Sequence, residues 1–253
     1  MSQYASSYGG SPAYSSCSSS YACGYSGSAA YSSLAAQGMP QESYASQKSM
    51  DASFFPPLEH MQETVFLEPN RVELPVITSD LDIMPLVRET FQALTDKELP
   101  SNIRITVATP EKCKHIHTST GGRWSESIQG FSINKAGKGT SEIVVKQAPL
   151  DSMMLTVGHE IGHVLTLPLA TTQDEEAKAF AFSIAWVKAI RQNNIGNIAG
   201  NFREAPAQNG VHDVGYAFVQ QLLERGKTAV RVYTELAKRI IAINTTPELI
   251  LIS

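Results

Sequence analysis

The sequence is poor in charged residues and lacks the features that mark membrane or secreted proteins. Only 17% of its 253 residues are charged and the formal net charge is −4, so the basic excess typical of general nucleic-acid binding is absent. No apolar run reaches the roughly 18 residues that a membrane-spanning helix needs, and the start shows no secretory signal. Three cysteines cannot build a disulfide framework. We therefore expect a soluble, cytoplasmic protein that binds neither nucleic acid nor membrane.

The missing charge is concentrated at the start of the chain. Residues 1–50 hold sixteen serines and seven of the nine tyrosines, but only Glu42 and Lys48 carry charge. Such a composition offers too little aliphatic surface to offset the entropy of ordering the chain. We predict that residues 1–55 form a disordered tail. Polar sequence with scattered aromatics can also self-associate weakly, although a simple solvated extension is the plainer interpretation.

The rest of the chain, residues 56–253, is long enough for one well-buried domain. Apolar spacing within 81–94 predicts a helix that starts at Pro85. Strands are predicted first and helices afterwards, which favours an α+β fold. The expected strands lie at 103–107, 128–133 and 143–145, with a hairpin loop at 134–140, and the expected later helices at 151–166, 173–193, 212–225 and 228–242.

The most informative motif is His159-Glu160-Ile161-Gly162-His163. On a helix, residues four apart lie on one face, so His159 and His163 can direct two imidazole nitrogens at one zinc ion. Glu160 would lie beside the metal and act as the general base toward a water molecule. Asp151 or Ser152 is expected to cap this helix, and Pro168 forbids its continuation. Gly162 is a poor helix former, which suggests close approach by another helix.

A catalytic zinc usually has three protein ligands, and the next helix offers candidates for the third. Thr172 and Glu175 have the spacing of a capping box, a structural role that would occupy Glu175. Glu176 has no such role and lies one turn before Phe180 on the same face. We favour Glu176 as the third ligand, with Glu175 and His212 as alternatives.

HEIGH followed by EEAKAFAF resembles the gluzincin branch of zinc metallopeptidases, particularly the small domains of the ImmA/IrrE type. The matching motifs cover residues 156–181. The resemblance implies a zincin-like fold with a short, mostly antiparallel sheet, an active-site helix carrying His159, Glu160 and His163, and a second helix carrying the glutamate. It also implies that the strand before the active-site helix, Ser141–Gln147, lies at the sheet edge, where an extended substrate could pair with it.

Two other groups of residues have candidate roles. His212 and Tyr216 lie four apart on an expected helix, and zincins often use a downstream His or Tyr to stabilise the developing oxyanion. Packing of His212 near Asp213 is an equally good explanation of that residue. Cys113, His115 and His117 alternate, so on a strand they would share one face and could bind a second metal ion. An exposed strand end explains the same pattern without metal.

The sequence thus predicts a zinc-dependent metallopeptidase that hydrolyses peptide bonds in a peptide or protein substrate, with Zn²⁺ held by His159, His163 and Glu176. A different class of protein also fits: a non-catalytic, metal-stabilised interaction module whose low-complexity tail mediates association. The sequence leaves the oligomeric state open.

Overall fold

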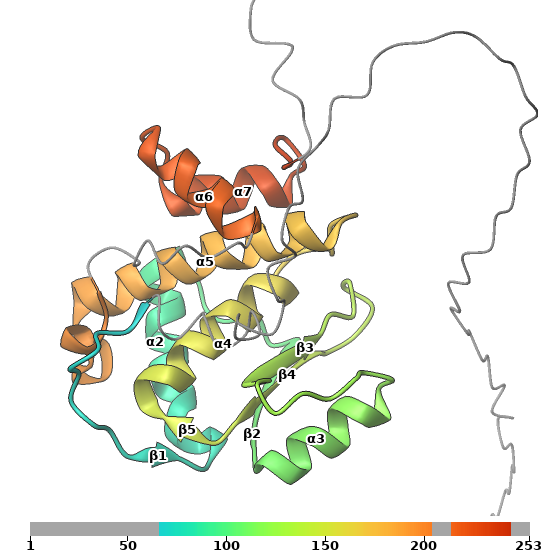
Figure 1. The fold of residues 1–253 in the computed structure, drawn as a ribbon, viewed down its shortest axis with the longest axis vertical. Coiled ribbons are helices and arrows are strands. Elements are labelled where there is room, and N and C mark those ends of the chain that lie inside the picture. Colours follow the sequence, from blue (N-terminus) through green and yellow to red (C-terminus); the bar gives the residue numbers. More distant parts are fainter. Residues whose placement is uncertain (1–65, 204–213, 244–253) are drawn as a thin grey trace, which may run out of the picture. The chain divides into compact units, whose positions relative to one another are not determined.

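The computed structural model describes residues 66–203 and 214–243, which form an α+β fold (Figure 1). The predicted disordered tail, its boundary near residue 55, and His212 all lie outside the described residues. None of the helices in the described part is long and apolar enough to cross a membrane. The elements follow in the order β1 (Val76–Ile77), α2 (Asp80–Thr95), β2 (Ile103–Ala108), α3 (Pro110–Ser119), β3 (Gly130–Ile133), β4 (Ser141–Lys146), β5 (Ala148–Pro149), α4 (Leu150–Val164), α5 (Thr172–Asn193), the 3-10 turns η2 (Ile195–Asn197) and η3 (Ala199–Asn201), α6 (Val214–Glu224) and α7 (Ala229–Ala237).

The main sheet has three strands in the order β2-β4-β3. β2 is parallel to β4, with Ile105 opposite Ile143, and β3 is antiparallel to β4, with Ser132 opposite Ile143. β1 and β5 form a separate antiparallel pair. The predicted strands and the hairpin between β3 and β4 are therefore confirmed, and two of these three pairings are antiparallel.

The prediction that Ser141–Gln147 forms the sheet edge is wrong, because β4 pairs on both sides. Its sequence explains why. Ile143 and Val145 belong to the main core, whereas Val144 packs on the opposite face in a small cluster with Cys113 and Ala108. A strand that is apolar on both faces is typical of a sheet interior. The edge strand that lies against α4 is β3.

Helices cover both faces of this sheet. α3 packs against β2 and β4 on one face, and α4 packs against β3 and β4 on the other (Figure 1). α5 then lies against α4, and α6 and α7 pack on α5. Almost every residue of α4 is consequently buried. The helix that carries the His159–His163 motif, α4, thus occupies the middle of the core. Its polar side chains therefore need hydrogen-bond partners from neighbouring elements.

Two glycines allow α4 and α5 to approach closely. A Cβ on Gly162 would lie 2.9 Å from the Ala179 Cα and 3.0 Å from the Phe182 Cβ. A Cβ on Gly158, one turn earlier, would lie 2.4 Å from the ring of Trp186, whose Nε1 donates to the Met154 carbonyl. The predicted packing role of Gly162 is confirmed, and Gly158 extends the same contact.

The start of α4 differs from the prediction that Asp151 or Ser152 caps it. The residue before the first turn is Pro149, which provides no side-chain cap. Asp151 is 1% exposed and accepts hydrogen bonds from Arg71 Nε at 2.9 Å and Asn201 Nδ2 at 2.7 Å. Because these partners are 80 and 50 residues away in the chain, the local sequence could not reveal this use of the carboxylate.

α2 begins earlier than predicted. Its N-cap is Ser79, whose side chain accepts from the Leu81 N–H, so Pro85 lies inside the helix instead of at its start. Pro85 is exposed, so water can reach the carbonyl that lacks a helical partner. Burial of Ile83, Val87 and Phe91 stabilises the continuous helix.

The segment carrying Cys113, His115 and His117 is helix α3 and not a strand. Thr109 caps it by accepting from the Lys112 N–H, and proline stands at its first position, both standard start signals. On a helix, His115 points away from its two neighbours in the pattern. Cys113 is buried, His115 is exposed, and His117 packs against the ring of Phe131. The three do not form a metal-binding group among the described residues.

Candidate metal centre

His159 and His163 meet on one face of α4, as their spacing predicts. Their Nε2 atoms are 3.1 Å apart and their ring centroids 4.8 Å apart. Each ring is also held through its other nitrogen. His159 Nδ1 lies 3.3 Å from Ser183 Oγ, and His163 Nδ1 lies 3.0 Å from Glu175 Oε1. Both contacts come from α5, so the orientation of the two rings depends on the packing of the two helices.

Glu176 brings a carboxylate to the same point from α5. Its Oε2 lies 3.4 Å from His159 Nε2, and its Oε1 lies 3.7 Å from His163 Nε2. One ligand atom from each of the three residues falls within 4.8 Å of the others. His159, His163 and Glu176 form a group that could hold a metal ion, and they are the three residues that the sequence analysis favoured.

The start of α5 determines which glutamate faces which nitrogen. The predicted Thr172–Glu175 capping box is wrong by one residue. Thr171 is the N-cap, its Oγ1 accepts from the Asp174 N–H at 3.1 Å, and its hydroxyl donates to the Asp174 carboxylate at 2.7 Å. Glu175 is therefore available to support His163 and also accepts from the Leu169 N–H at 2.7 Å.

The donor atoms fit a metal cation. Zinc–ligand distances of 2.0–2.1 Å in a tetrahedral site put neighbouring ligand atoms about 3.3 Å apart, close to the separations between these nitrogen and oxygen atoms. Ser183 Oγ donates its one proton to the Ala179 carbonyl, so His159 Nδ1 is the donor in the contact with Ser183. Likewise His163 Nδ1 donates to the Glu175 carboxylate. In the neutral rings, both Nε2 atoms then direct lone pairs at each other and at Glu176, which favours a shared cation.

The electrostatics of the metal-free protein point the same way. Burial lowers the pKa of His163, but the hydrogen bond to Glu175 and the charges of Glu160 and Glu176 outweigh it, so the pKa is raised overall. Burial raises the pKa of the Glu176 carboxyl, yet its contact with His159 outweighs that effect and the pKa is lowered. The pocket thus keeps its carboxylate ionised and attracts positive charge.

Exposure decreases from Glu176 to His159. The Glu176 side chain is 34% exposed, that of His163 15%, and that of His159 5%. Glu160 follows His159 on α4, is 8% exposed, and is close enough for its charge to raise the pKa of His163. The group is therefore anchored in the core and accessible from the side of Glu176, which a site that admits water and substrate requires.

Phe180 forms the inner wall of the group, one turn after Glu176. Its ring packs edge-on against His159 at 5.2 Å and against Tyr216 at 5.5 Å between centroids. Tyr216 is 5% exposed, and burial raises the pKa of its hydroxyl to about 12. Tyr216 is thus joined to His159 through the Phe180 ring, and its role in stabilising an oxyanion stays a prediction.

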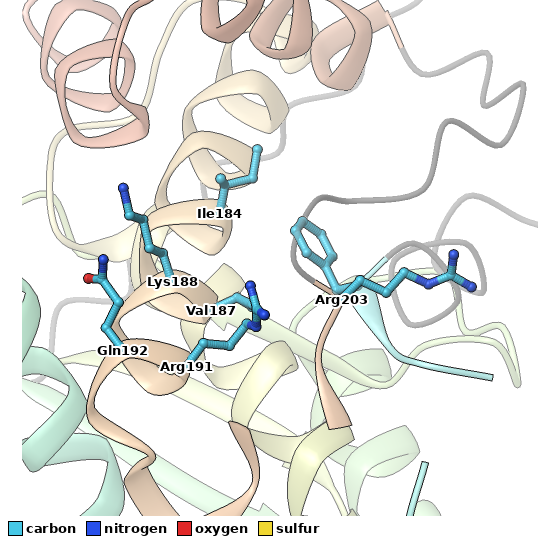
Figure 2. A pocket seen from close by; sticks show the side chains of 7 residues that line it. Ile184, Val187, Lys188, Arg191, Gln192 and Arg203 are labelled. Atoms are coloured by element: carbon cyan, nitrogen blue, oxygen red, sulfur yellow. The ribbon is translucent and has the colours of Figure 1, made fainter. Parts of the chain in front are cut away.

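A separate cavity of about 430 Å³ lies along the C-terminal half of α5 (Figure 2). Its lining includes the basic residues Lys188, Arg191 and Arg203 but none of the candidate ligands His159, His163 and Glu176. Figure 2 shows the side chains of Lys188 and Arg203 extending in different directions. This arrangement does not converge on one ligand position as the His and Glu side chains do.

Sequence reasoning missed three residues that support the metal centre. Ser183 orients His159, and Lys178 pairs with Glu175 at 2.8 Å. Asn134 donates from Nδ2 to the carbonyls of His163 and Thr166, both at 2.7 Å, and so ties the end of β3 to the end of α4. Of the three, only Lys178 offered a local signal, because it is a lysine at a buried helix position where an apolar residue is expected.

Comparisons with protein families, curated proteins and solved structures return no match for this chain. The functional conclusion therefore depends on the geometry of the site and on its chemistry.

Proposed function

We propose that this protein is a zinc-dependent metallopeptidase with a zincin-like fold of the gluzincin type. The observation that supports it is the convergence of His159, His163 and Glu176 on one point, with Glu160 next to the first histidine on the same helix. Two histidines and a carboxylate with an accessible side are a donor set that suits catalytic zinc. Zinc is favoured over magnesium or calcium because those ions prefer all-oxygen sites.

Zinc bound there would polarise the substrate carbonyl and lower the pKa of a water molecule. The protein's own residues do the rest. Glu160 takes a proton from the attacking water and later delivers it to the leaving amine nitrogen, so the peptide bond breaks with no net proton change on the enzyme. His159 and His163 are held in one tautomer by Ser183 and Glu175. Phe180 keeps water from the inner side of His159.

The substrate strand would pair with β3. The strand expected in this role, Ser141–Gln147, forms β4 and has partners on both sides. β3 lies at the sheet edge, and its last residue precedes Asn134, which is bonded to the end of the motif helix. An extended peptide added to this edge would run along α4 near the histidines.

The experiment that tests the proposal is Glu160→Gln, assayed for zinc content and for cleavage of a mixed peptide library. We expect about one zinc per chain in both proteins and a loss of about 10²–10⁴-fold in cleavage rate in the variant, as for removal of a general base. Glu89→Gln is the matched control, because it makes the same chemical change at an exposed position of α2. Unchanged cleavage in Glu160→Gln would refute the role of Glu160.

A non-catalytic, metal-stabilised module predicts a different result from the same experiment. Zinc would raise the melting temperature of the wild-type protein, but no peptide of the library would be cut and Glu160→Gln would change nothing. The 34% exposure of Glu176 favours the enzyme, since a purely structural zinc site is closed by four protein ligands.

A further inference from the structure

Lys178 is a lysine with no exposed surface, located on α5 half a turn after Glu176. Lysine is almost never fully buried unless its ammonium group is paired. Here the Nζ atom lies 2.8 Å from Glu175 Oε1 and 3.4 Å from each of the carbonyl oxygens of His163 and Leu167. Its partners are therefore Glu175, which contacts the candidate ligand His163, and the backbone at and just after the C-terminal end of α4.

Glu175 is held by three donors at once. Oε1 accepts from His163 Nδ1 at 3.0 Å and from Lys178 Nζ, and Oε2 accepts from the Leu169 N–H at 2.7 Å. The carboxylate therefore cannot rotate without breaking at least one of these bonds. Of the three donors, only Lys178 carries a full charge when His163 is neutral.

We propose that Lys178 is a positioning residue for the metal centre: it fixes the Glu175 carboxylate, which in turn orients the His163 ring so that Nε2 faces the metal position. This inference rests on the proposed zinc site. Packing alone does not require an ammonium group here, because methionine has nearly the same length and fills the same space without a charge to desolvate. The contact with the His163 carbonyl adds a second hold on the same residue.

The test compares Lys178→Met, Glu175→Gln and the double variant with the wild-type protein. Zinc dissociation constants come from competition with a chelator, and the absorption spectrum of bound Co²⁺ reports the ligand geometry. Each single variant should bind zinc about 10–100-fold more weakly, the range typical of losing an outer partner of a metal ligand. If Lys178 acts through Glu175, the double variant should be no weaker than Glu175→Gln alone, and its Co²⁺ spectrum should match that of Glu175→Gln. Lys188→Met, an exposed change on the same helix, is the control.

The possible outcomes separate this inference from the proposed function. No zinc binding by the wild-type protein would refute the metal site itself. Zinc binding by the wild-type protein with unchanged affinity in Lys178→Met would refute the role of Lys178 alone, as would losses that multiply in the double variant. If Lys178→Met does not fold, Glu175→Gln still decides, because wild-type affinity in that variant would show that the pair does not orient His163.

Discussion

Replacing Gly162 by alanine tests whether the contact between α4 and α5 sets the metal geometry. The added Cβ would lie 2.9 Å from the Ala179 Cα, 3.0 Å from the Phe182 Cβ and 3.2 Å from the Ala179 carbonyl oxygen. These are atoms of the α5 backbone and of a Cβ, and none of them can move by a side-chain rotation. The two helices would have to separate by about 0.5 Å to restore ordinary contact distances near 3.5 Å.

The expected stability change is the difference of two effects. Alanine in place of glycine inside a helix gains about 1 kcal/mol of helix propensity. Overpacking of a well-packed core costs about 1–3 kcal/mol. The net loss should therefore be about 0–2 kcal/mol, or a melting temperature up to about 8 °C lower for a domain of this size. The matched control is Gly200→Ala, because a Cβ there would meet nothing within 4 Å.

Zinc affinity should reveal the contact more clearly than stability. Both histidines lie on α4, where their Nε2 atoms are 3.1 Å apart. The distances from Glu176 to His159 and His163, now 3.4 and 3.7 Å, cross the interface and should lengthen. Gly162→Ala should thus bind zinc more weakly. Its stability is measured by thermal unfolding, and its zinc affinity by competition with a chelator. A variant that is about 1 kcal/mol more stable with unchanged zinc affinity would refute the reasoning, because it would show the propensity gain alone.

Two further predictions concern stability away from the metal centre. Asp151→Ala should lower the free energy of unfolding, measured in urea, by about 2–3 kcal/mol. This is less than the roughly 3–5 kcal/mol for breaking a fully buried pair, because the partner Arg71 is 33% exposed. A loss below about 0.5 kcal/mol would contradict this estimate. Hydrogen bonds from Lys227 and Arg231 lower the pKa of Glu235, so its contribution is complete above the unfolded pKa near 4.5 and is lost as the pH falls through the folded value. Glu235→Gln should therefore be about 0.5–1 kcal/mol less stable at pH 7, and this difference should shrink as the pH falls below 4.5 and through the lowered pKa of Glu235. A difference that stays constant in acid would contradict the pairing.

The parts of the fold that depend on local sequence were predictable. The four-residue spacing of His159 and His163 defines one helix face whatever surrounds it, and the glycine at 162 signals close packing in the same way. The alternation that predicts β2 is also local, because it reflects burial of one face of a single strand. These features needed no knowledge of the neighbouring elements.

The errors come from two physical sources. Strand order is a tertiary property, so nothing within 141–147 states that β2 pairs on its second side, although three consecutive buried residues favoured an interior strand. The α3 segment was predicted as a strand because Cys113, His115 and His117 alternate. The helix-start signals at Thr109 and Pro110 outweigh that alternation. Long-range partners such as Asn134 and Ser183 had no local signal at all.

The adjacent glutamates at the start of α5 show how a single residue of helix register determines the chemistry of this site. An imidazole ring offers two nitrogens that face different directions. Glu175 contacts Nδ1 of His163 at 3.0 Å, and Glu176 lies 3.7 Å from Nε2 of the same ring. Because consecutive helical residues are turned by about 100°, a shift of one residue that brought Glu176 to the place of Glu175 would bring Ala177 to the metal position and leave it without a carboxylate. The Thr171 cap that fixes the helix start and the Gly162 contact that fixes the helix separation together decide that Glu176, and not Glu175, completes the donor set.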